Sequence, residues 1–291
     1  MKTFPASQLI INGDGSAFHL HIRPEHLADK VILVGDQDRV NMVASFFDEG
    51  SIECDIQSRE FHTITGKFQG KRISCISTGI GTDNCDIVLN EIDALANIDF
   101  NTRTEKEQKR SLEICRIGTC GAMQDDIPLG SFLVSQKSIG FDGVLAFYDG
   151  RDRIADLGFE KALVDFIHYP QKAARPYVVS ANEELVDRIA GKDMLRGCTI
   201  AANGFYGPQG RVLRCDIAVP DINTRITEFR YEGQRITNYE MEGSAIAGLS
   251  LLMGHKAMTV CCVIAQRKVE AANTDYKPRI KELVKTVLKR I

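Results

Sequence analysis

The sequence predicts a three-layer α/β fold, with helices on both faces of a central sheet. Short apolar runs typical of buried strands alternate with segments whose apolar residues recur at helical spacing. The chain has 291 residues, of which 44% are hydrophobic and 26% charged, as in ordinary globular proteins. No Pro-, Gly- or Ser-rich linker interrupts it, so we expect a single domain over residues 1–291.

The first half of the chain sets the pattern. Residues 31–34 are a continuous apolar run that ends at Gly35, which predicts a buried strand. Residues 39–47 follow with apolar positions at helical spacing. Residues 71–77 and 85–97 repeat the same order of strand and helix. Alternation of this kind is typical of strands joined by helices that lie on the faces of a sheet.

The second half continues the alternation. Residues 257–265 are almost wholly apolar, which predicts a strand buried on both faces. Residues 276–291 alternate basic and apolar positions and predict a closing amphipathic helix. The other expected strands are 113–117, 131–135, 176–180 and 236–240, and the other expected helices are 183–190 and 244–253.

Composition excludes several classes of function. A net charge of −3 argues against a protein that holds nucleic acid by a bulk positive field. The nine cysteines are scattered, with no C-x-x-C and no His/Cys cluster at zinc spacing, so we expect reduced thiols in a cytoplasmic protein. Residues 1–5 lead into no apolar stretch, so no signal peptide is expected. No apolar run approaches the roughly 18 residues of a membrane span.

Two glycine-containing segments follow predicted strands, where open α/β sheets bind ligands. In 35–39, a glycine and a helix N-terminus favour an anion, and Arg39 offers a charged donor. Residues 77–82 combine glycines and hydroxyls in a tight loop. Both segments are also compatible with ordinary turns. Neither has the glycine spacing of a dinucleotide-binding motif or of a phosphate-binding loop.

Arg116 lies inside the apolar run that predicts the strand at 113–117. A charged group in such a place is unfavourable unless it is paired. Either a bound anion or a buried carboxylate partner explains it. The segment that begins with it, Arg116-Ile117-Gly118-Thr119-Cys120-Gly121, is therefore a candidate ligand site.

Two more polar segments complete the candidate site. In 205–211, Phe205, Gln209 and Arg211 can cover and hydrogen-bond a planar polar ring, although the segment also reads as a surface loop. In 238–243, Glu240 and Glu242 share one face if the backbone is extended, which suits ribose hydroxyls. The alternative there is a helix N-terminus with favourable acidic residues.

These segments, in order, resemble the nucleoside phosphorylase family, and within it the uridine phosphorylase branch. The resemblance runs from about Phe18 to the C-terminal helix. The matching segments are Gly35-Asp36-x-Asp38-Arg39, Ser58-Arg59-Glu60-Phe61, Ser77-Thr78-Gly79-Ile80-Gly81, Arg116-Ile117-Gly118-Thr119, Gln209-x-Arg211 and Asn238-Tyr239-Glu240-Met241-Glu242.

The resemblance implies one α/β domain whose mixed central sheet curls toward a barrel, and assembly as dimers or hexamers with shared active sites. The phosphate site it implies is Gly35, Arg39, Arg59, Arg116 and Thr119. The ribose contacts are His19, Thr119, Met241 and Glu242, with His19 and Arg59 reaching into the neighbouring subunit. The base pocket is Cys120, Gly121, Phe205, Gln209, Arg211, Ile264 and Ala265, and the catalytic residues are Glu242, Arg116 and Arg211.

The activity implied is phosphorolysis of uridine, with inorganic phosphate as co-substrate and no cofactor. Purine-cleaving relatives place an aspartate after the last core strand, where this chain has Ile264-Ala265-Gln266-Arg267. A potassium site at Glu60, Ile80 and Asn84 stays open, because Asn84 stands where potassium-binding relatives have serine. The alternatives are a purine nucleoside phosphorylase, a nucleosidase that uses water, and a non-catalytic nucleoside-binding protein. The preference among uridine, deoxyuridine and thymidine also stays open.

Overall fold

The computed structural model describes residues 2–267 and 271–291, and twelve strands of this part form one sheet. These strands are β1 (Lys30–Val34), β2 (Cys54–Ser58), β3 (Phe61–Phe68), β4 (Lys71–Ser77), β7 (Glu113–Ala122), β8 (Phe132–Gly140), β9 (Tyr177–Ser180), β10 (Leu195–Ala201), β11 (Arg230–Tyr231), β12 (Gln234–Glu240), β13 (Lys256–Gln266) and β14 (Ala271–Ala272). Their order is β11-β12-β10-β8-β13-β7-β1-β4-β3-β2, while β9 pairs with β8 and β14 with β13.

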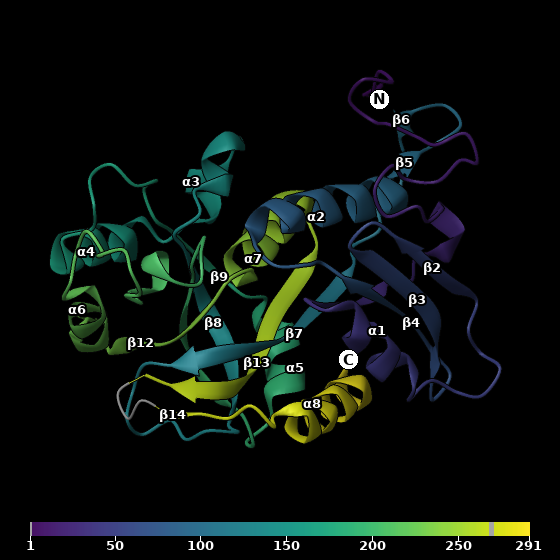
Figure 1. Ribbon diagram of the computed structural model, residues 1–291. Helices are drawn as coiled ribbons and strands as arrows, with labels where there is room; N and C mark the ends of the chain where they lie inside the picture. Colours follow the sequence, from purple (N-terminus) through teal and green to yellow (C-terminus); the bar gives the residue numbers. More distant parts are fainter. Residues whose placement is uncertain (1, 268–270) are drawn as a thin grey trace.

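One half of this sheet closes on itself (Figure 1). β12 also pairs with β7, antiparallel, through Asn238 opposite Ala122 and Tyr239 opposite Gly121. The ring β12-β10-β8-β13-β7 is therefore a five-stranded barrel, and β1, β4, β3 and β2 extend from it as an open wing. Parallel pairs such as β1–β4 and antiparallel pairs such as β3–β4 occur together. The expected mixed sheet that curls toward a barrel is confirmed.

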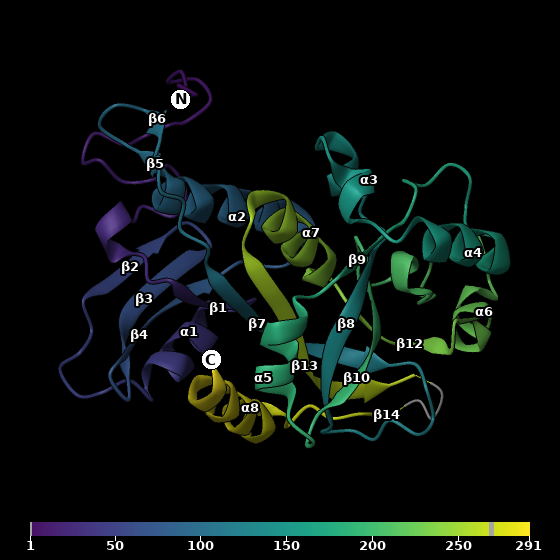
Figure 2. The same ribbon diagram turned by 180° about the vertical axis from the view of Figure 1, so that it is seen from behind.

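Helices cover both faces of the sheet, as expected. The helix α2 (Thr82–Asn97) packs beside α7 (Gly243–Met253) on one face (Figures 1 and 2). On the other face lie α1 (Gln37–Ala44), α5 (Glu183–Ala190) and α8 (Lys277–Arg290). Two apolar cores result, one between each helical layer and the sheet.

The remaining elements lie outside these layers. α4 (Leu157–Ile167) and α6 (Ile222–Glu228) share a third apolar core with β10 and β12. α3 (Arg151–Ile154) and the short 3-10 helices η1 (Pro24–His26), η2 (Val144–Phe147) and η3 (Gly207–Gln209) lie in connections, and β5 (Ile98–Asp99) pairs with β6 (Thr104–Glu105). Among the described residues, no helix is both long and apolar enough to cross a bilayer.

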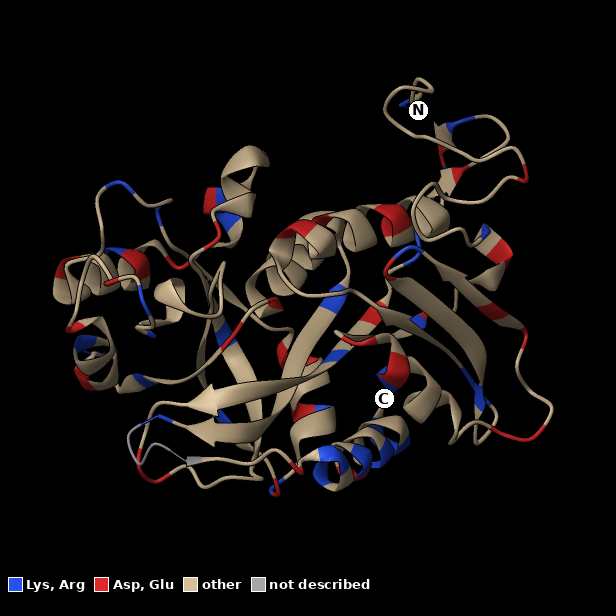
Figure 3. Ribbon diagram, viewed as in Figure 1, with Lys and Arg blue, Asp and Glu red and all other residues tan. Residues whose placement is uncertain are grey.

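The local sequence explains where elements begin and what they bury. α1 is capped by Asp36, the residue before it, whose carboxylate accepts the backbone N–H of Asp38 at 2.9 Å. α8 buries Ile280, Leu283, Val284, Val287 and Leu288. Its lysines are exposed, and basic residues colour much of the helix blue in Figure 3, which confirms the predicted amphipathic helix. Each strand and helix expected from the sequence is present. The elements that were not expected are β2, β3, β5, β6, β10, β11, β14, α3, α4 and α6.

Candidate active site

A cavity of about 680 Å³ opens at the carboxyl ends of β1, β7 and β12. It brings together thirteen of the fifteen site residues expected from the sequence, although segments more than 200 residues apart contribute them. These are Gly35, Arg39, Arg116, Thr119, Cys120, Gly121, Phe205, Gln209, Arg211, Met241, Glu242, Ile264 and Ala265. His19 and Arg59 do not line it.

Arg116 is the buried centre of this cavity. The residue is 4% exposed, its Nη1 lies 3.3 Å from Glu240 Oε2, and its Nη2 donates to the carboxylate of Glu242. A Cβ at Gly118 would lie 2.1 Å from Arg116 Nη1, so glycine there makes room for the guanidinium. Burial opposes the positive charge, but Glu242 and Glu240 raise the pKa of Arg116 above its ordinary value. The expected buried partner exists, and it is a carboxylate pair.

The two glutamates differ in their positions. Glu240 ends β12 and accepts the backbone N–H groups of Glu242 and Gly243 at 2.9 Å. Glu242 is the N-cap residue of α7, and its Oε1 accepts the N–H of Gly81 at 2.8 Å. Only Glu240 belongs to the strand, so Glu242 fits the helix-terminus alternative. Burial raises the pKa of Glu240 to about 7, even though Arg116 acts in the opposite sense.

Arg39 lies beside this cluster without a carboxylate of its own. It is in the first turn of α1, and its Nη1 donates to the carbonyl of Ile117 at 3.4 Å. Burial and the charge of Arg116 lower its pKa. No ion pair to Arg39 occurs within the part of the chain that the structure describes. Two guanidiniums thus lie near the carboxyl ends of β1 and β7, with Gly35 and Thr119 beside them, and such groups can donate charged hydrogen bonds to an anion.

Gln209 is the centre of the other end of the cavity. Its Oε1 accepts from Arg211 Nη1 at 2.6 Å and from Arg267 Nη2 at 2.8 Å. The guanidinium of Arg211 stacks 3.7 Å from the centre of the Phe205 ring. Burial, reinforced by the nearby charge of Arg211, lowers the pKa of Arg267 to about 10. Because both guanidiniums use the Gln209 oxygen, the Nε2 amide is left to bond a ligand.

His19 and Arg59 lie near one another outside the cavity lining, although Glu60, next to Arg59 in the chain, belongs to that lining. His19 Nδ1 is 2.7 Å from Glu91 Oε1 on α2. Arg59, in the turn between β2 and β3, has a φ of 54° and holds its guanidinium 5.2 Å from the centre of the Phe18 ring. Phe18 and His19 contact each other edge to face, with ring centres 4.8 Å apart. Both residues are therefore placed beside one another but outside the cavity of their own chain.

The residues considered for potassium are brought only partly together. Glu60 and Ile80 line the cavity, but Asn84 does not. Asn84 Nδ2 donates to the Ile80 carbonyl at 3.4 Å, so this carbonyl, one of the oxygens considered for the ion, already accepts a hydrogen bond. Within residues 2–267 and 271–291, no three His, Cys, Asp or Glu side chains are grouped so that they could hold a metal ion.

Several cavity residues were not expected from the sequence. Glu240 was considered with Glu242 for the ribose hydroxyls, but its role as the second partner of Arg116 was not expected. Tyr239 and Tyr276 also line the wall. Tyr276 precedes α8, and no local pattern indicates that the packing of α8 brings it there.

Comparison with known proteins agrees with this geometry. The family model described as the phosphorylase superfamily matches residues 29–289. A uridine phosphorylase of Thermococcus kodakarensis is 28% identical over 262 residues, which are 87% of this chain and 79% of that protein. A DeoD-type purine nucleoside phosphorylase of Aliivibrio fischeri is 25% identical over 84% of each chain.

Solved structures show the same fold. A Trypanosoma brucei nucleoside phosphorylase, described as showing uridine phosphorylase activity, has a TM-score of 0.87 and 28% identity, and the match covers 97% of this chain and 99% of that one. A Toxoplasma gondii purine nucleoside phosphorylase shares the fold with a TM-score of 0.68 at 19% identity. With the family model matching nearly the whole chain, this protein belongs to the phosphorylase superfamily.

Proposed function

We propose that this enzyme cleaves uridine with inorganic phosphate to give uracil and ribose 1-phosphate. The observation that carries the proposal is the pairing of two sites in one cavity. At one end are Arg39 and Arg116 with Glu242, and at the other is Gln209 held by two arginines. A free phosphate matches the first end, and the planar polar base of a nucleoside matches the second, with the ribose between them.

The first part of the reaction is binding and orientation. Phosphate takes a place beside Arg39, Arg116, Gly35 and Thr119, below the sugar. Glu242 accepts hydrogen bonds from the ribose hydroxyls through lone pairs that Gly81 and Arg116 leave free. When the phosphate binds, the guanidinium of Arg116 turns toward it, and its contacts with the two carboxylates weaken. Positioning of this kind, together with electrostatic stabilisation, accelerates the step without a protein nucleophile.

The bond change is a displacement at C1′. A phosphate oxygen forms a bond to C1′ as the C1′–N1 bond breaks, and the electron pair of that bond goes to N1 of the uracil. The departing base then takes a proton from water, and the ribose 1-phosphate formed gives up the proton that the phosphate carried. The developing negative charge is met by the Gln209 amide and, through it, by Arg211 and Arg267. These bonds strengthen as charge grows, so they favour the transition state over the bound substrate.

The pyrimidine preference rests on the base end. Ile264 and Ala265 line it, and no carboxylate follows them before Arg267, whereas purine release is helped by an acid that protonates N7. The curated uridine phosphorylase and the trypanosomal structure support the same choice. The DeoD-type relatives make purine cleavage the main rival.

We further propose that two copies of the chain complete each active site. His19 and Arg59 are side by side but outside the cavity of their own chain, so a second copy is needed for them to reach ribose and phosphate. The exposed Ile80 at the cavity edge supports an interface there. Such dimers can assemble further into hexamers.

We also propose that the reaction needs no cofactor or metal and takes place in the cytoplasm. The first point is supported by an arginine-based phosphate site. The second is supported by the nine cysteines, which are all free thiols. Dialysis against EDTA in potassium-free buffer is expected to leave the rate unchanged, and loss of activity that potassium or a divalent ion restores would contradict the first point.

The function is tested by assaying uridine, 2′-deoxyuridine, thymidine and inosine with and without phosphate, and by measuring both the base and ribose 1-phosphate. We expect uracil and ribose 1-phosphate in equal amounts, only with phosphate. Base release without phosphate identifies a nucleosidase, and faster inosine cleavage identifies a purine phosphorylase. Tight uridine binding without any product identifies a binding protein.

A further inference from the structure

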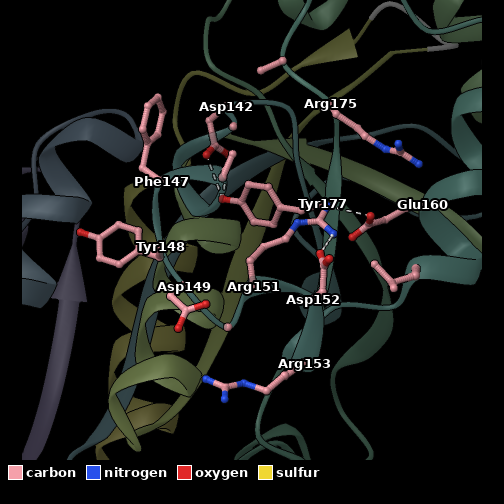
Figure 4. A pocket seen from close by; sticks show the side chains of 15 residues that line it. Asp142, Phe147, Tyr148, Asp149, Arg151, Asp152, Arg153, Glu160, Arg175 and Tyr177 are labelled. Atoms are coloured by element: carbon pink, nitrogen blue, oxygen red, sulfur yellow. Dashed lines mark hydrogen bonds and ion pairs between the residues drawn. The ribbon is translucent and has the colours of Figure 1, made fainter.

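The first turn of α7 is fixed by a second polar cluster, on the side away from the nucleoside cavity. Asp142 Oδ2 accepts the hydroxyl of Ser244 at 2.9 Å, and Asp142 Oδ1 accepts the hydroxyl of Tyr177 at 2.8 Å. The backbone N–H of Val144 donates to Oδ1 at 2.8 Å as well. Figure 4 shows Asp142 and Tyr177 pointing toward one another in the wall of a separate cavity of about 920 Å³.

The sequence makes room for this cluster. A Cβ at Gly140 would lie 2.3 Å from Tyr177 Cζ and 2.7 Å from Asp142 Oδ2, so no other residue fits there without displacing both. Ser244 is fully buried, and Tyr177 is 1% exposed. Buried hydrogen bonds to a carboxylate are among the stronger ones in proteins. None of these side chains lines the nucleoside cavity.

Ser244 is two residues after Glu242, the N-cap of α7. The start of this helix is therefore held from two sides. On one side Glu240 accepts the N–H of Gly243, and on the other Asp142 holds the Ser244 hydroxyl. A functional carboxylate must stay within about 0.5 Å of its productive position, and a rigid helix start provides this.

We propose that Asp142, acting through Ser244, is a positioning residue that holds Glu242 against the ribose hydroxyls and so sets the preference for ribonucleosides over 2′-deoxyribonucleosides. The inference rests on the proposed function, because it takes Glu242 as the ribose contact. A 2′-deoxyribonucleoside has one hydroxyl fewer for Glu242 to bind. Its cleavage therefore depends less on the position of that carboxylate.

The test compares Ser244→Ala with Ser250→Ala, since both serines are fully buried on α7. The Ser250 hydroxyl has no hydrogen-bond partner among the described residues, so its loss is the matched control. We expect Ser244→Ala to lower kcat/KM for uridine on the order of tenfold and for 2′-deoxyuridine clearly less. The ratio of the two should stay at the wild-type value in Ser250→Ala. Tyr177→Phe, which removes the other hydroxyl from Asp142, should change the ratio in the same direction.

Thermal unfolding shows whether each variant is folded at the assay temperature. If folded Ser244→Ala keeps the wild-type ratio, the positioning role is wrong while the proposed function stands. If the wild type cleaves no nucleoside, the proposed function fails instead. In that case amide hydrogen exchange at residues 243–246 tests whether Ser244 anchors the start of α7. Faster exchange in Ser244→Ala than in Ser250→Ala supports the anchoring, and equal exchange in the two variants overturns it.

Discussion

Removing the charge of Arg116 tests the buried cluster on which the site is built. Arg116, Glu240 and Glu242 are each 4% exposed, so Arg116→Met keeps the volume of the side chain but leaves two buried carboxylates without their cation. Breaking a buried pair in this way lowers the free energy of unfolding by about 3–5 kcal/mol. The loss of the phosphate contact should also lower turnover by about 10²-fold or more.

The loss of stability should depend on pH with a defined sign. The pKa of Glu240 in the folded state is about 7, above the value of about 4.3 for an unfolded glutamate. Between these values the folded protein binds more protons than the unfolded chain, so the free energy of unfolding falls as pH rises. Without Arg116 the folded pKa rises further. The destabilisation of Arg116→Met should therefore be large at pH 8 and smaller at pH 5.5.

Urea unfolding followed by far-UV circular dichroism at both pH values measures this. Arg196→Met is the matched control, because Arg196 forms an exposed pair with Asp187 at 2.7 Å and such pairs contribute about 0–1 kcal/mol. Arg116→Met combined with Glu242→Gln should recover part of the stability but no activity. A loss below about 1 kcal/mol at pH 8, or one that grows at pH 5.5, would refute the buried-cluster reasoning.

Three further predictions concern the ligand contacts. Glu242→Ala should lower the turnover of uridine on the order of 10²-fold, and a wild-type rate would remove it from the site. Arg59→Ala and Glu242→Ala subunits, each inactive alone, should recover about a quarter of wild-type activity when they are mixed. The reason is that half of the dimers then contain one subunit of each variant, and one of their two sites has both residues intact. No recovery of activity argues against shared sites. Gln209→Glu should slow uracil release more than Gln209→Ala, because its charge opposes the departing base, and the reverse order in initial rates contradicts that role.

The sequence predicted the fold where its signals are local. The apolar run of β13 and the amphipathic spacing of α8 each determine an element without help from the rest of the chain. β2 is an edge strand in which only Cys54 is fully buried, so its pattern is mostly polar. The turn between β3 and β4 uses Gln69 and Gly70, both with positive φ, and glutamine there gives a weak hairpin signal.

The helix α4 was not predicted, although its sequence contains signals that indicate a helix. Asp156 caps this helix, and Phe159, Leu163 and Ile167 recur at four-residue spacing and are fully buried. The pattern is short, and it lies between irregular connections, so it is easily taken for part of a loop.

The candidate site shows the same division between local and tertiary signals. The segment at Gly35–Arg39 was predictable because it follows a strand. The buried position of Arg116 likewise predicted a charged partner. The identity of that partner was not predictable, since Glu242 is 126 residues away and reaches Arg116 only through the packing of α7. Tyr276 enters the cavity in the same indirect way.

The central claim is that phosphate, and not water, cleaves a pyrimidine nucleoside in this cavity. The most direct measurement is the yield of ribose 1-phosphate per uracil released from uridine, at increasing phosphate. The account predicts one ribose 1-phosphate per uracil and a rate that falls to the background without phosphate. Uracil release that continues undiminished without phosphate, with free ribose as the product, would contradict it.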